Sequence, residues 1–328
     1  SQLKEFVPEA RILITVAAIK DVVELLHEQG FDDWIAAGPL LEKLRLPEAN
    51  PLPFAIETCI LCHTGFLHPE RAFLRSIDLI ITERCSLKCH DCANLMQYYT
   101  HPQNVDFNLL TRSIDQLCAS LDEMMEMRII GGDALMNKEW HRVVAHALEK
   151  QNILRVIVYT NGAIVPSAKQ APLLQHPKVL MLITDYGDIS CNMNHLKTYL
   201  TDHRIAHQIL HVDNWLDCAS LNKHHRTPEA HQQIYKDCCA KNMLSLSDGK
   251  LFRCPFAANA HRLQAAPDIP TDYVDIFSDD ARHKIMNYVL SNVPLSTCDF
   301  CNGRPLSGQE VPPAVQINTP RSYTAYSI

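Results

Sequence analysis

The chain has 328 residues, of which 47% are hydrophobic and 20% charged, with 10 glycines and 19 prolines. This composition is typical of a folded globular protein, and the length exceeds what one hydrophobic core usually organises. The 30 basic and 37 acidic side chains give a net charge of −7, which excludes a broad phosphate-neutralising surface and argues against nucleic-acid binding.

Residues 1–75 are expected to form a small βαβ-like unit followed by a connection to the main domain. The predicted strand, helix and strand cover residues 11–17, 19–28 and 33–37. A proline-rich stretch, residues 46–53, breaks this pattern. We therefore expect residues 46–75 to be the connection.

Cys59, Cys62 and His63 in this connection match the Cys-x-x-Cys-His pattern of c-type haem attachment. That chemistry occurs outside the cytoplasm, and the chain starts without the basic and then apolar layout of a signal peptide. No apolar run approaches the roughly 18–20 residues of a membrane helix. We therefore predict a soluble cytoplasmic protein that binds no membrane, and we interpret the two cysteines as buried thiols.

Predicted strands and helices alternate through the next part of the chain. The strands cover residues 77–82, 127–130, 153–159, 179–184 and 205–210, and the helices cover residues 108–125, 138–150 and 195–201. Alternation of this kind indicates an α/β fold with a parallel sheet and crossover helices. In such sheets the chemistry lies at the carboxyl ends of the strands.

Cys85, Cys89 and Cys92 directly follow the first strand of this sheet. The chain has 13 cysteines, and in a reducing compartment grouped cysteines more often bind metal than form disulfides. A structural zinc site or a closed four-iron cluster normally takes four protein ligands, whereas three leave one iron open to a small molecule. Reduced cysteines, or a zinc site completed by a distant ligand, are the alternatives.

The spacing C-x3-C-x2-C after a first strand resembles the radical S-adenosylmethionine (SAM) superfamily. The resemblance implies a partial (β/α)6 TIM-like barrel over residues 76–230 and a 4Fe-4S cluster whose open iron binds the amino and carboxylate groups of SAM. An external electron donor such as flavodoxin or ferredoxin would then drive cleavage to a 5′-deoxyadenosyl radical. Asp91 stands where the family often has an aromatic residue.

Three further strand ends carry residues that the resemblance assigns to SAM. Gly131-Gly132-Asp133 resembles the family's Gly-Gly-Glu motif, which binds the methionyl amino group, with Asp133 in place of Glu. Asn161 and Asp185 end the next two strands, and the resemblance implies contacts with the SAM carboxylate or ribose, or with the substrate. Turn formation alone is the alternative for both of them.

Residues 231–328 are expected to form a small irregular domain held together by metal. Four cysteines, Cys239, Cys254, Cys298 and Cys301, suffice for a closed site, and Asp248-Gly249 predicts a hairpin turn between the first two. Spacing alone favours zinc. After a radical SAM barrel, however, the pattern resembles SPASM and twitch extensions, which implies an auxiliary 4Fe-4S cluster. Cys238 also satisfies the pattern, and Cys239 is preferred.

Besides Cys59, Cys62 and the second member of the Cys238–Cys239 pair, three cysteines lie outside both sets. Cys118 is expected in a helix core, and Cys191 is unassigned. Cys218 follows the last barrel strand, where it either packs or donates a hydrogen atom to a substrate radical.

The resemblance implies oxidation of a secondary alcohol in a carbohydrate-like or cyclitol small molecule, with the auxiliary cluster as electron acceptor. One alternative is a radical epimerase that uses Cys218 as hydrogen donor. Another is a peptide-modifying maturase, although residues 1–75 show no winged-helix pattern. The non-enzymatic alternative is a zinc or iron–sulfur binding protein.

Overall fold

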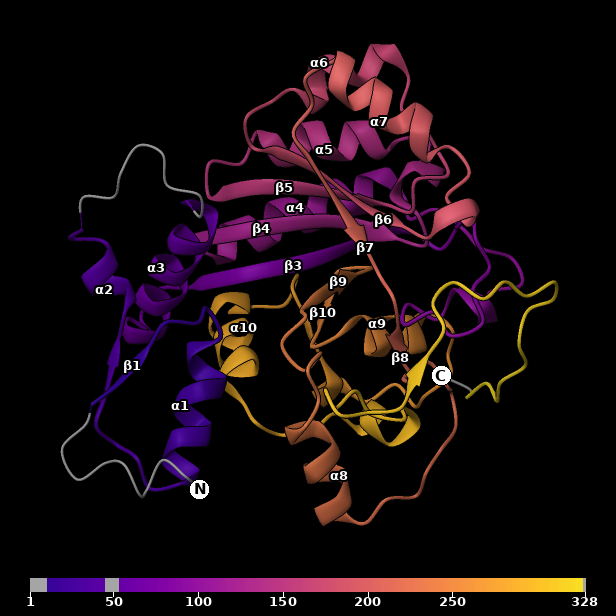
Figure 1. Cartoon of the computed structure of the whole chain (residues 1–328). Coiled ribbons are helices and arrows are strands. Elements are labelled where there is room, and N and C mark those ends of the chain that lie inside the picture. The colour runs from indigo at the N-terminus through magenta and orange to yellow at the C-terminus, as the bar shows by residue number, and fades with distance from the viewer. Residues whose placement is uncertain (1–10, 45–52, 327–328) are drawn as a thin grey trace. The chain divides into compact units, whose positions relative to one another are not determined.

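The computed structural model describes residues 11–44 and 53–326 of the chain (Figure 1). The chain divides into two compact units, Ser1–Arg75 and Ser76–Ile328. Most of the proline-rich stretch, residues 46–52, lies outside the described residues. Among the described residues, no helix has both the length and the apolar character needed to cross a bilayer.

The first unit confirms the predicted strand, helix and strand. Parallel strands β1 (Ile12–Ile14) and β2 (Trp34–Ala36) flank helix α1 (Ile19–Glu28), and Ile14, Ile19, Leu26 and Ala36 form the core between them. A short helix α2 (Gly38–Leu41) comes before the predicted connection, residues 46–75. The connection itself contains helix α3 (Pro53–Leu67), because Pro53 at a helix start is compatible with the apolar, helix-forming residues after it.

The Cys59-x-x-Cys62-His63 pattern has a packing role in α3. Both thiols are buried, as predicted, and His63 is fully buried. The His63 Nδ1 accepts a hydrogen bond from the Gly38 backbone N–H at 3.0 Å, while Nε2 lies 2.9 Å from the Val16 carbonyl oxygen. These partners fit a neutral imidazole protonated at Nε2, which joins α3 to two neighbouring segments of the unit.

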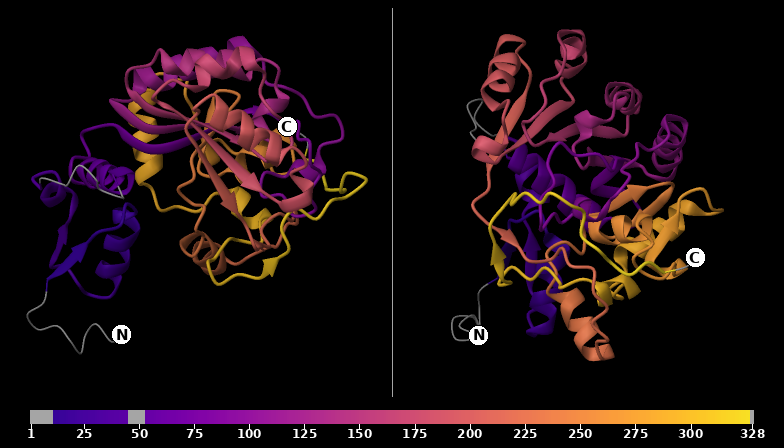
Figure 2. Two further views of the ribbon diagram at one scale, coloured as in Figure 1. Left: turned by 45° about the horizontal axis from the view of Figure 1, so that its top comes forward. Right: turned by 90° about the vertical axis from the view of Figure 1, so that its right-hand side faces the viewer.

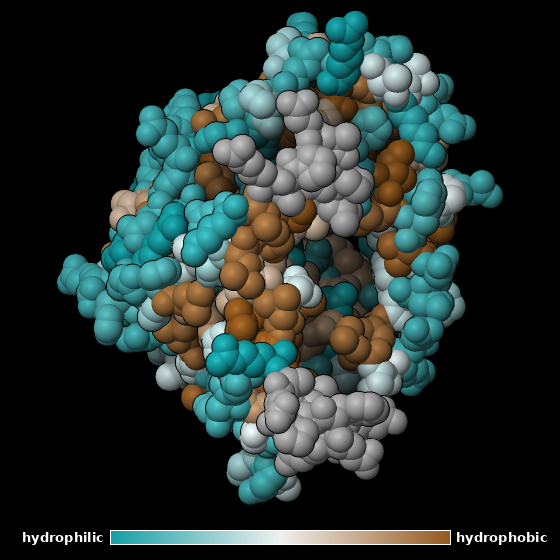
Figure 3. Space-filling model, turned by 60° about the vertical axis from the view of Figure 1, so that its left-hand side comes forward, coloured by the Kyte–Doolittle hydropathy of each residue, from teal (hydrophilic) through white to brown (hydrophobic). Residues whose placement is uncertain are grey.

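Several large apolar side chains are exposed on the described part of the first unit. Figure 3 shows hydrophobic residues gathered on the face of the molecule that it presents. The exposed large apolar side chains of the unit are Leu13, Val16, Leu25, Leu40, Leu44, Phe54 and Leu67.

The second unit contains a mostly parallel sheet with the strand order β11-β10-β9-β3-β4-β5-β6-β7. Its central strands are β3 (Phe73–Thr82), β4 (Glu123–Gly131), β5 (Ile153–Thr160), β6 (Val179–Asp185) and β7 (His207–His211). Neighbours from β4 to β7 pair in parallel. The structure therefore confirms a mixed α/β fold with a large parallel sheet.

Helices connect these strands over one face of the sheet (Figures 1 and 2). They are α4 (Phe107–Ser120), α5 (Trp140–Leu148), α6 (Ala171–Leu174) and α7 (Met193–Asp202). Asp106 caps α4 by accepting a hydrogen bond from the Leu109 backbone N–H at 2.9 Å. The predicted helix 108–125 is too long. Its last residues belong to β4, because the backbone from Met124 onward pairs with β5.

The sixth strand of the predicted barrel is absent from this sheet. Among the described residues between β7 and residue 231, the one further strand is β8 (Trp215–Leu216), which pairs antiparallel with β12 (Glu310–Val311) instead. On the other side of β3, strand β9 (Ser245–Ser247) from the C-terminal part pairs in parallel. The predicted division between residues 230 and 231 therefore falls inside one compact unit.

The part after residue 230 is more regular than predicted. Strands β9 and β10 (Lys250–Phe252) form the predicted hairpin, with positive φ at both turn residues, Asp248 and Gly249. Strand β11 (Tyr273–Asp275) extends the sheet, and the helices are α8 (Pro228–Lys236), α9 (Pro255–Arg262) and α10 (Ala281–Leu290). Helix α9 packs Ala257 and Ala258 against the sheet residues Ile80 and Ile130.

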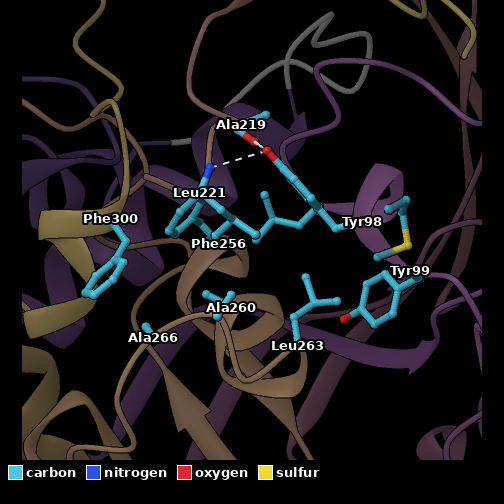
Figure 4. Packing of buried hydrophobic residues seen from close by; sticks show 12 residues of the cluster. Tyr98, Tyr99, Ala219, Leu221, Phe256, Ala260, Leu263, Ala266 and Phe300 are labelled. Carbon is cyan, nitrogen blue, oxygen red and sulfur yellow. Dashed lines mark hydrogen bonds between the residues drawn. The ribbon is translucent and has the colours of Figure 1, made fainter. Parts of the chain in front are cut away.

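An apolar cluster fixes the chain that follows the three-cysteine loop (Figure 4). Tyr98 and Tyr99 pack there with residues of α9 and with Leu221. The Tyr98 hydroxyl donates to the Ala219 carbonyl at 3.1 Å and accepts from the Leu221 backbone N–H at 3.3 Å. This cluster joins the end of the loop to the segment that carries Cys218.

Candidate functional site

The three cysteines after β3 line one side of a cavity of about 320 Å³ in the second unit. Cys85, Cys89 and Cys92 all reach it, and so does Cys218 from the segment after β7. Other residues that line the cavity include Asp78, Asp91, Arg128, Gly132, Tyr159, Asn161, Tyr186, Trp215, Leu216 and Arg304. The cavity therefore combines thiols, charged groups and aromatic rings from many elements.

Two glycines at the end of β4 allow the cysteine loop to lie close to the sheet. A Cβ atom on Gly131 would lie 2.2 Å from the Thr82 carbonyl oxygen, and one on Gly132 would lie 2.4 Å from that of Arg84. The Gly132 backbone N–H also donates to the Thr82 carbonyl at 3.1 Å. The glycines are thus required by contact with the protein's own loop, and Gly132 in addition lines the cavity.

Asp133 holds the ends of β4 and β5 together. Its carboxylate is buried and accepts from the Leu135 backbone N–H at 2.9 Å, the Thr160 hydroxyl at 2.9 Å and the Asn161 backbone N–H at 3.0 Å. Burial raises the pKa of this carboxyl, and the three hydrogen bonds oppose that shift. Asp133 does not line the cavity, so a contact with SAM stays a prediction.

Asn161 and Asp185 have different surroundings. The Asn161 side chain lines the cavity, where its Nδ2 donates to the Ser86 hydroxyl at 3.0 Å and lies 3.6 Å from the Cys85 sulfur. Asp185 does not line the cavity, and its Oδ2 pairs with the Lys197 ammonium at 3.7 Å. Of the two, Asn161 is the one that the structure brings to the three thiols.

Burial affects the charge state of all three thiols. Burial raises the pKa of all three, to about 12 for Cys89, so that their thiolate forms need a positively charged partner. Among the described residues, no three His, Cys, Asp or Glu side chains form a group that could hold one metal ion.

A polar wall that the sequence analysis missed faces the cavity from β3, β4 and β5. Asp78, Arg128 and Tyr159 line it. The Asp78 carboxylate is buried, and its partner in the described part of the chain is the Arg128 guanidinium at 3.8 Å. Arg128 also binds Glu126 at 2.8 and 2.9 Å. Burial raises the pKa of Asp78 to about 7, opposed by Arg128 and reinforced by Glu126.

The signal for this wall was present in the strand patterns. Side chains alternate between the two faces of a strand, so a charged residue inside an apolar run stands on one defined face. Asp78 interrupts the apolar run of β3, and Glu126 and Arg128 lie two residues apart on β4. Charges at such buried positions are rare in a structural core.

The second cysteine set surrounds a much smaller cavity of about 40 Å³. Cys238, Cys254, Cys298 and Cys301 line it together with apolar residues that include Ile234, Phe256 and Leu295. Burial raises the pKa of all four thiols. Of the two neighbours, the structure brings Cys238 to this cavity, whereas the side chain of the preferred Cys239 is exposed and does not line it.

The Cys298-x-x-Cys301 segment is held by two charged side chains. Cys298 lies on the 3-10 helix η7 (Ser296–Phe300), whose first backbone N–H groups donate to the Asp272 carboxylate at 2.7 Å. The Arg226 guanidinium donates to the carbonyl oxygens of Cys298 at 3.0 Å and Cys301 at 2.8 Å. These bonds fix the backbone that presents both thiols.

Cys218, Cys118 and Cys191 differ in their burial. Cys218 is buried, and its carbonyl oxygen lies 3.6 Å from the Cys301 sulfur, so it lies between the larger cavity and the second set. Burial raises the pKa of its thiol to about 11. Cys118 on α4 is only partly buried, and Cys191 is exposed.

Comparison with known proteins gives distant similarities of fold. No protein-family profile and no curated protein match the chain. The solved structures with a similar fold include BtrN in complex with AdoMet and 2-DOIA, at 16% identity and a TM-score of 0.45 over 70% of this chain and 93% of BtrN. They also include anSMEcpe with bound AdoMet and a Kp18Cys peptide, at 10% identity and a TM-score of 0.44 over 67% and 84%. These values leave the reaction to be inferred from the residues.

Proposed function

We propose that this chain is a radical SAM enzyme that oxidises a secondary alcohol of a carbohydrate-like or cyclitol small molecule. The observation that carries the proposal is that three thiols from one loop open onto a cavity with a charged wall. Cys85, Cys89 and Cys92 would hold a 4Fe-4S cluster and leave one iron for SAM. When bound, this cluster supplies reductive cleavage of SAM to a 5′-deoxyadenosyl radical, with the electron delivered by a donor such as flavodoxin or ferredoxin.

The chain's own groups near the thiols suit the polar end of SAM. The backbone of Gly132 lines the cavity wall, and the side-chain amide of Asn161 lies beside Cys85. Asp133 acts behind them by fixing the Asn161 backbone N–H at 3.0 Å. Gly131 and Asp133 are therefore assigned a supporting role at this end of the cavity, and a contact of Asp185 with SAM stays a prediction.

Two aromatic rings in the cavity wall suit a substrate ring that carries hydroxyl groups. The rings of Tyr186 and Trp215 meet edge to face with centroids 5.7 Å apart, and both line the cavity. Such rings pack against the C–H faces of a sugar or cyclitol, while a few convergent polar groups fix its orientation. Asp78 and Arg128 supply a hydrogen-bond acceptor and a donor for neighbouring hydroxyls.

We assign Asp78 as the group that accepts the proton of the substrate hydroxyl. Oxidation of an alcohol to a carbonyl removes one hydrogen atom from carbon, one proton from oxygen and one electron. A carboxyl whose pKa is raised to about 7 accepts a proton near neutral pH, and the Arg128 guanidinium 3.8 Å away stabilises its ionised form beforehand. The hydrogen atom on carbon would be removed by the radical that bound SAM supplies.

The second cysteine set supports an auxiliary 4Fe-4S cluster that would accept the remaining electron. Four thiols surround a small cavity whose other lining side chains are apolar apart from Thr297, which gives a complete ligand set. Cys218 lies between this set and the larger cavity. The two sites are therefore close enough in the fold to act on one substrate.

The first test is SAM cleavage by the anaerobically reconstituted full chain with dithionite as reductant. We expect 5′-deoxyadenosine from the wild type, none from Cys89→Ala and an unchanged yield from Cys191→Ala, whose thiol is exposed and outside both sets. If the wild type forms no 5′-deoxyadenosine with a panel of polyols and aminocyclitols present, the proposal is wrong.

A radical epimerase is the second candidate, because Cys218 is buried and lines the same cavity as the three thiols. A thiol in that position could return a hydrogen atom to the opposite face of the substrate. In deuterium oxide an epimerase would give product with one carbon-bound deuterium, and Cys218→Ala would abolish that product. A dehydrogenase would give a carbonyl product with either side chain at this position.

A further inference from the structure

The C-terminal tail pairs with the cysteine loop across more than two hundred residues of sequence. The His90 backbone N–H donates to the Val315 carbonyl at 2.7 Å, and the Ile317 N–H donates to the Lys88 carbonyl at 2.8 Å. Cys89 and Gln316 face each other between these bonds as an antiparallel bridge. The tail therefore lies directly against a residue of the three-thiol set.

The side chain of Gln316 completes this pairing. Its Oε1 accepts from the Lys88 backbone N–H at 2.8 Å. Its Nε2 lies 3.2 Å from the Cys89 sulfur and 2.7 Å from the Ala314 carbonyl oxygen, so the two amide hydrogens have separate acceptors. Cys89 itself is only 6% exposed, whereas Gln316 faces solvent on its other side. The amide is the polar group that the tail presents to this thiol.

Contacts on both sides fix the register of the tail. Before Gln316, strand β12 pairs with β8, and the buried Ala314 turns the chain with φ of +54°. After it, the Arg321 backbone N–H donates to the Gln97 carbonyl at 2.8 Å, and the Arg321 guanidinium donates to the His90 carbonyl at 3.3 Å. Slippage by one residue would turn Gln316 away from Cys89.

Aromatic contacts continue this attachment beyond Arg321. Tyr323 meets Tyr98 edge to face with ring centroids 5.7 Å apart, and its hydroxyl donates to the Leu263 carbonyl at 2.9 Å. Tyr326 meets Phe300 in the same way at 5.3 Å. The tail is thus held by α9 and by the segment after the cysteine loop, and it passes beside β8 (Figure 1).

We propose that Gln316 tunes the radical-generating cluster by donating a hydrogen bond from its Nε2 to the Cys89 sulfur. Hydrogen bonds to the ligand sulfurs are one of the factors that set the reduction potential of an iron–sulfur cluster. A donor stabilises the extra negative charge of the reduced form and so raises the potential. Gln316 is a positioning residue in this role, since it touches a cluster ligand rather than SAM or substrate. The inference rests on the proposed function.

The test is a potentiometric titration of the reconstituted full chain, followed by electron paramagnetic resonance. The three-thiol cluster is identified as the one whose spectrum changes when SAM is added. Gln316→Ala removes the donor, and we expect a shift of the midpoint potential to more negative values. Gln316→Glu keeps an acceptor for the Lys88 N–H but replaces the donor with a negative charge, so its shift should be larger.

Asn318→Asp is the matched control, because it adds the same charge to an exposed position two residues along the tail. It should leave the potential near the wild-type value. The inference is overturned if both Gln316 variants titrate like the wild type, or if Asn318→Asp shifts the potential as much as Gln316→Glu. If the Gln316→Glu variant does not retain iron, the midpoint potential of Gln316→Ala alone tests the inference. A wild type without any SAM-sensitive signal would instead contradict the proposed function.

Discussion

The two cysteine sets are built in opposite ways around their cavities. The first opens on about 320 Å³ of space whose walls carry charged and aromatic side chains, and the second encloses about 40 Å³ among apolar side chains. A cavity with convergent polar groups is suited to binding a ligand, whereas a small apolar one is not. The difference indicates that the first set meets an outside molecule and that the second is closed.

The two sets also differ in how the chain assembles them. Cys85, Cys89 and Cys92 come from one loop, which depends on the glycines at the end of β4 and on the tail for its support. The second set comes from three separate segments, around Cys238, around Cys254 and at η7. Loss of one thiol should therefore disturb the first site locally, while in the second it should loosen contacts between segments.

The largest effect that distinguishes the sets is expected from Cys298→Ala. This variant should lose the iron of the second set, keep SAM cleavage and form no oxidised product, because no acceptor remains for the last electron. Iron analysis, 5′-deoxyadenosine and product are measured on the same preparation. Cys191→Ala serves as the control for the loss of an exposed thiol. Oxidised product at the wild-type rate from Cys298→Ala would show that the second set has no redox role.

A smaller effect separates the neighbouring thiols Cys238 and Cys239. Cys238 lines the small cavity and Cys239 is exposed, so only Cys238→Ala should lower the iron content of the second set. Both variants remove one thiol at neighbouring positions, so each is the control for the other. The iron content per chain after reconstitution is the measurement. Equal losses in both variants, or a loss only in Cys239→Ala, would contradict the closed site described above.

Much of the sheet could be predicted because its strands carry continuous apolar runs. Strands β3, β5 and β6 appeared as such runs, and β1, α1 and β2 had the expected period. The helices after residue 230 were missed. Helix α8 has a weakly apolar face, and α9 is only eight residues long, so neither gives a strong periodic signal. Their start signals, Thr227-Pro228 and Cys254-Pro255, are local and easily overlooked.

The thiols of the candidate site were predictable, whereas most of their surroundings were not. A fixed spacing within one loop identifies Cys85, Cys89 and Cys92 without knowledge of the fold. Asp78 and Arg128 become a pair only when β3 and β4 lie side by side, and Gln316 reaches Cys89 only through the fold of the tail. The choice between Cys238 and Cys239 depended on side-chain direction, which neighbouring positions in a sequence do not reveal.

The smallest effect concerns the charged wall, which is the feature that most separates the larger cavity from the small one. The pKa of Asp78 is raised to about 7 from an ordinary value of 3.8, so between these values the folded chain binds more protons than the unfolded chain. Stability contributed by this group therefore falls as pH rises through that range and is constant above it. Asp78→Asn removes the cost of the buried charge.

Asp78→Asn should consequently gain stability relative to the wild type as pH rises from about 6 to about 8, by an amount on the order of 1 kcal/mol, since one pKa unit corresponds to about 1.4 kcal/mol. Thermal unfolding of both chains at the two pH values measures the gain, and Asp213→Asn, at an exposed position, is the control for the change in net charge. Because Arg128 keeps its bonds to Glu126 at 2.8 and 2.9 Å, the variant retains a partner for the guanidinium. A stability difference that is independent of pH would mean that Asp78 is ionised in the folded chain throughout this range, and would remove it as the proton acceptor.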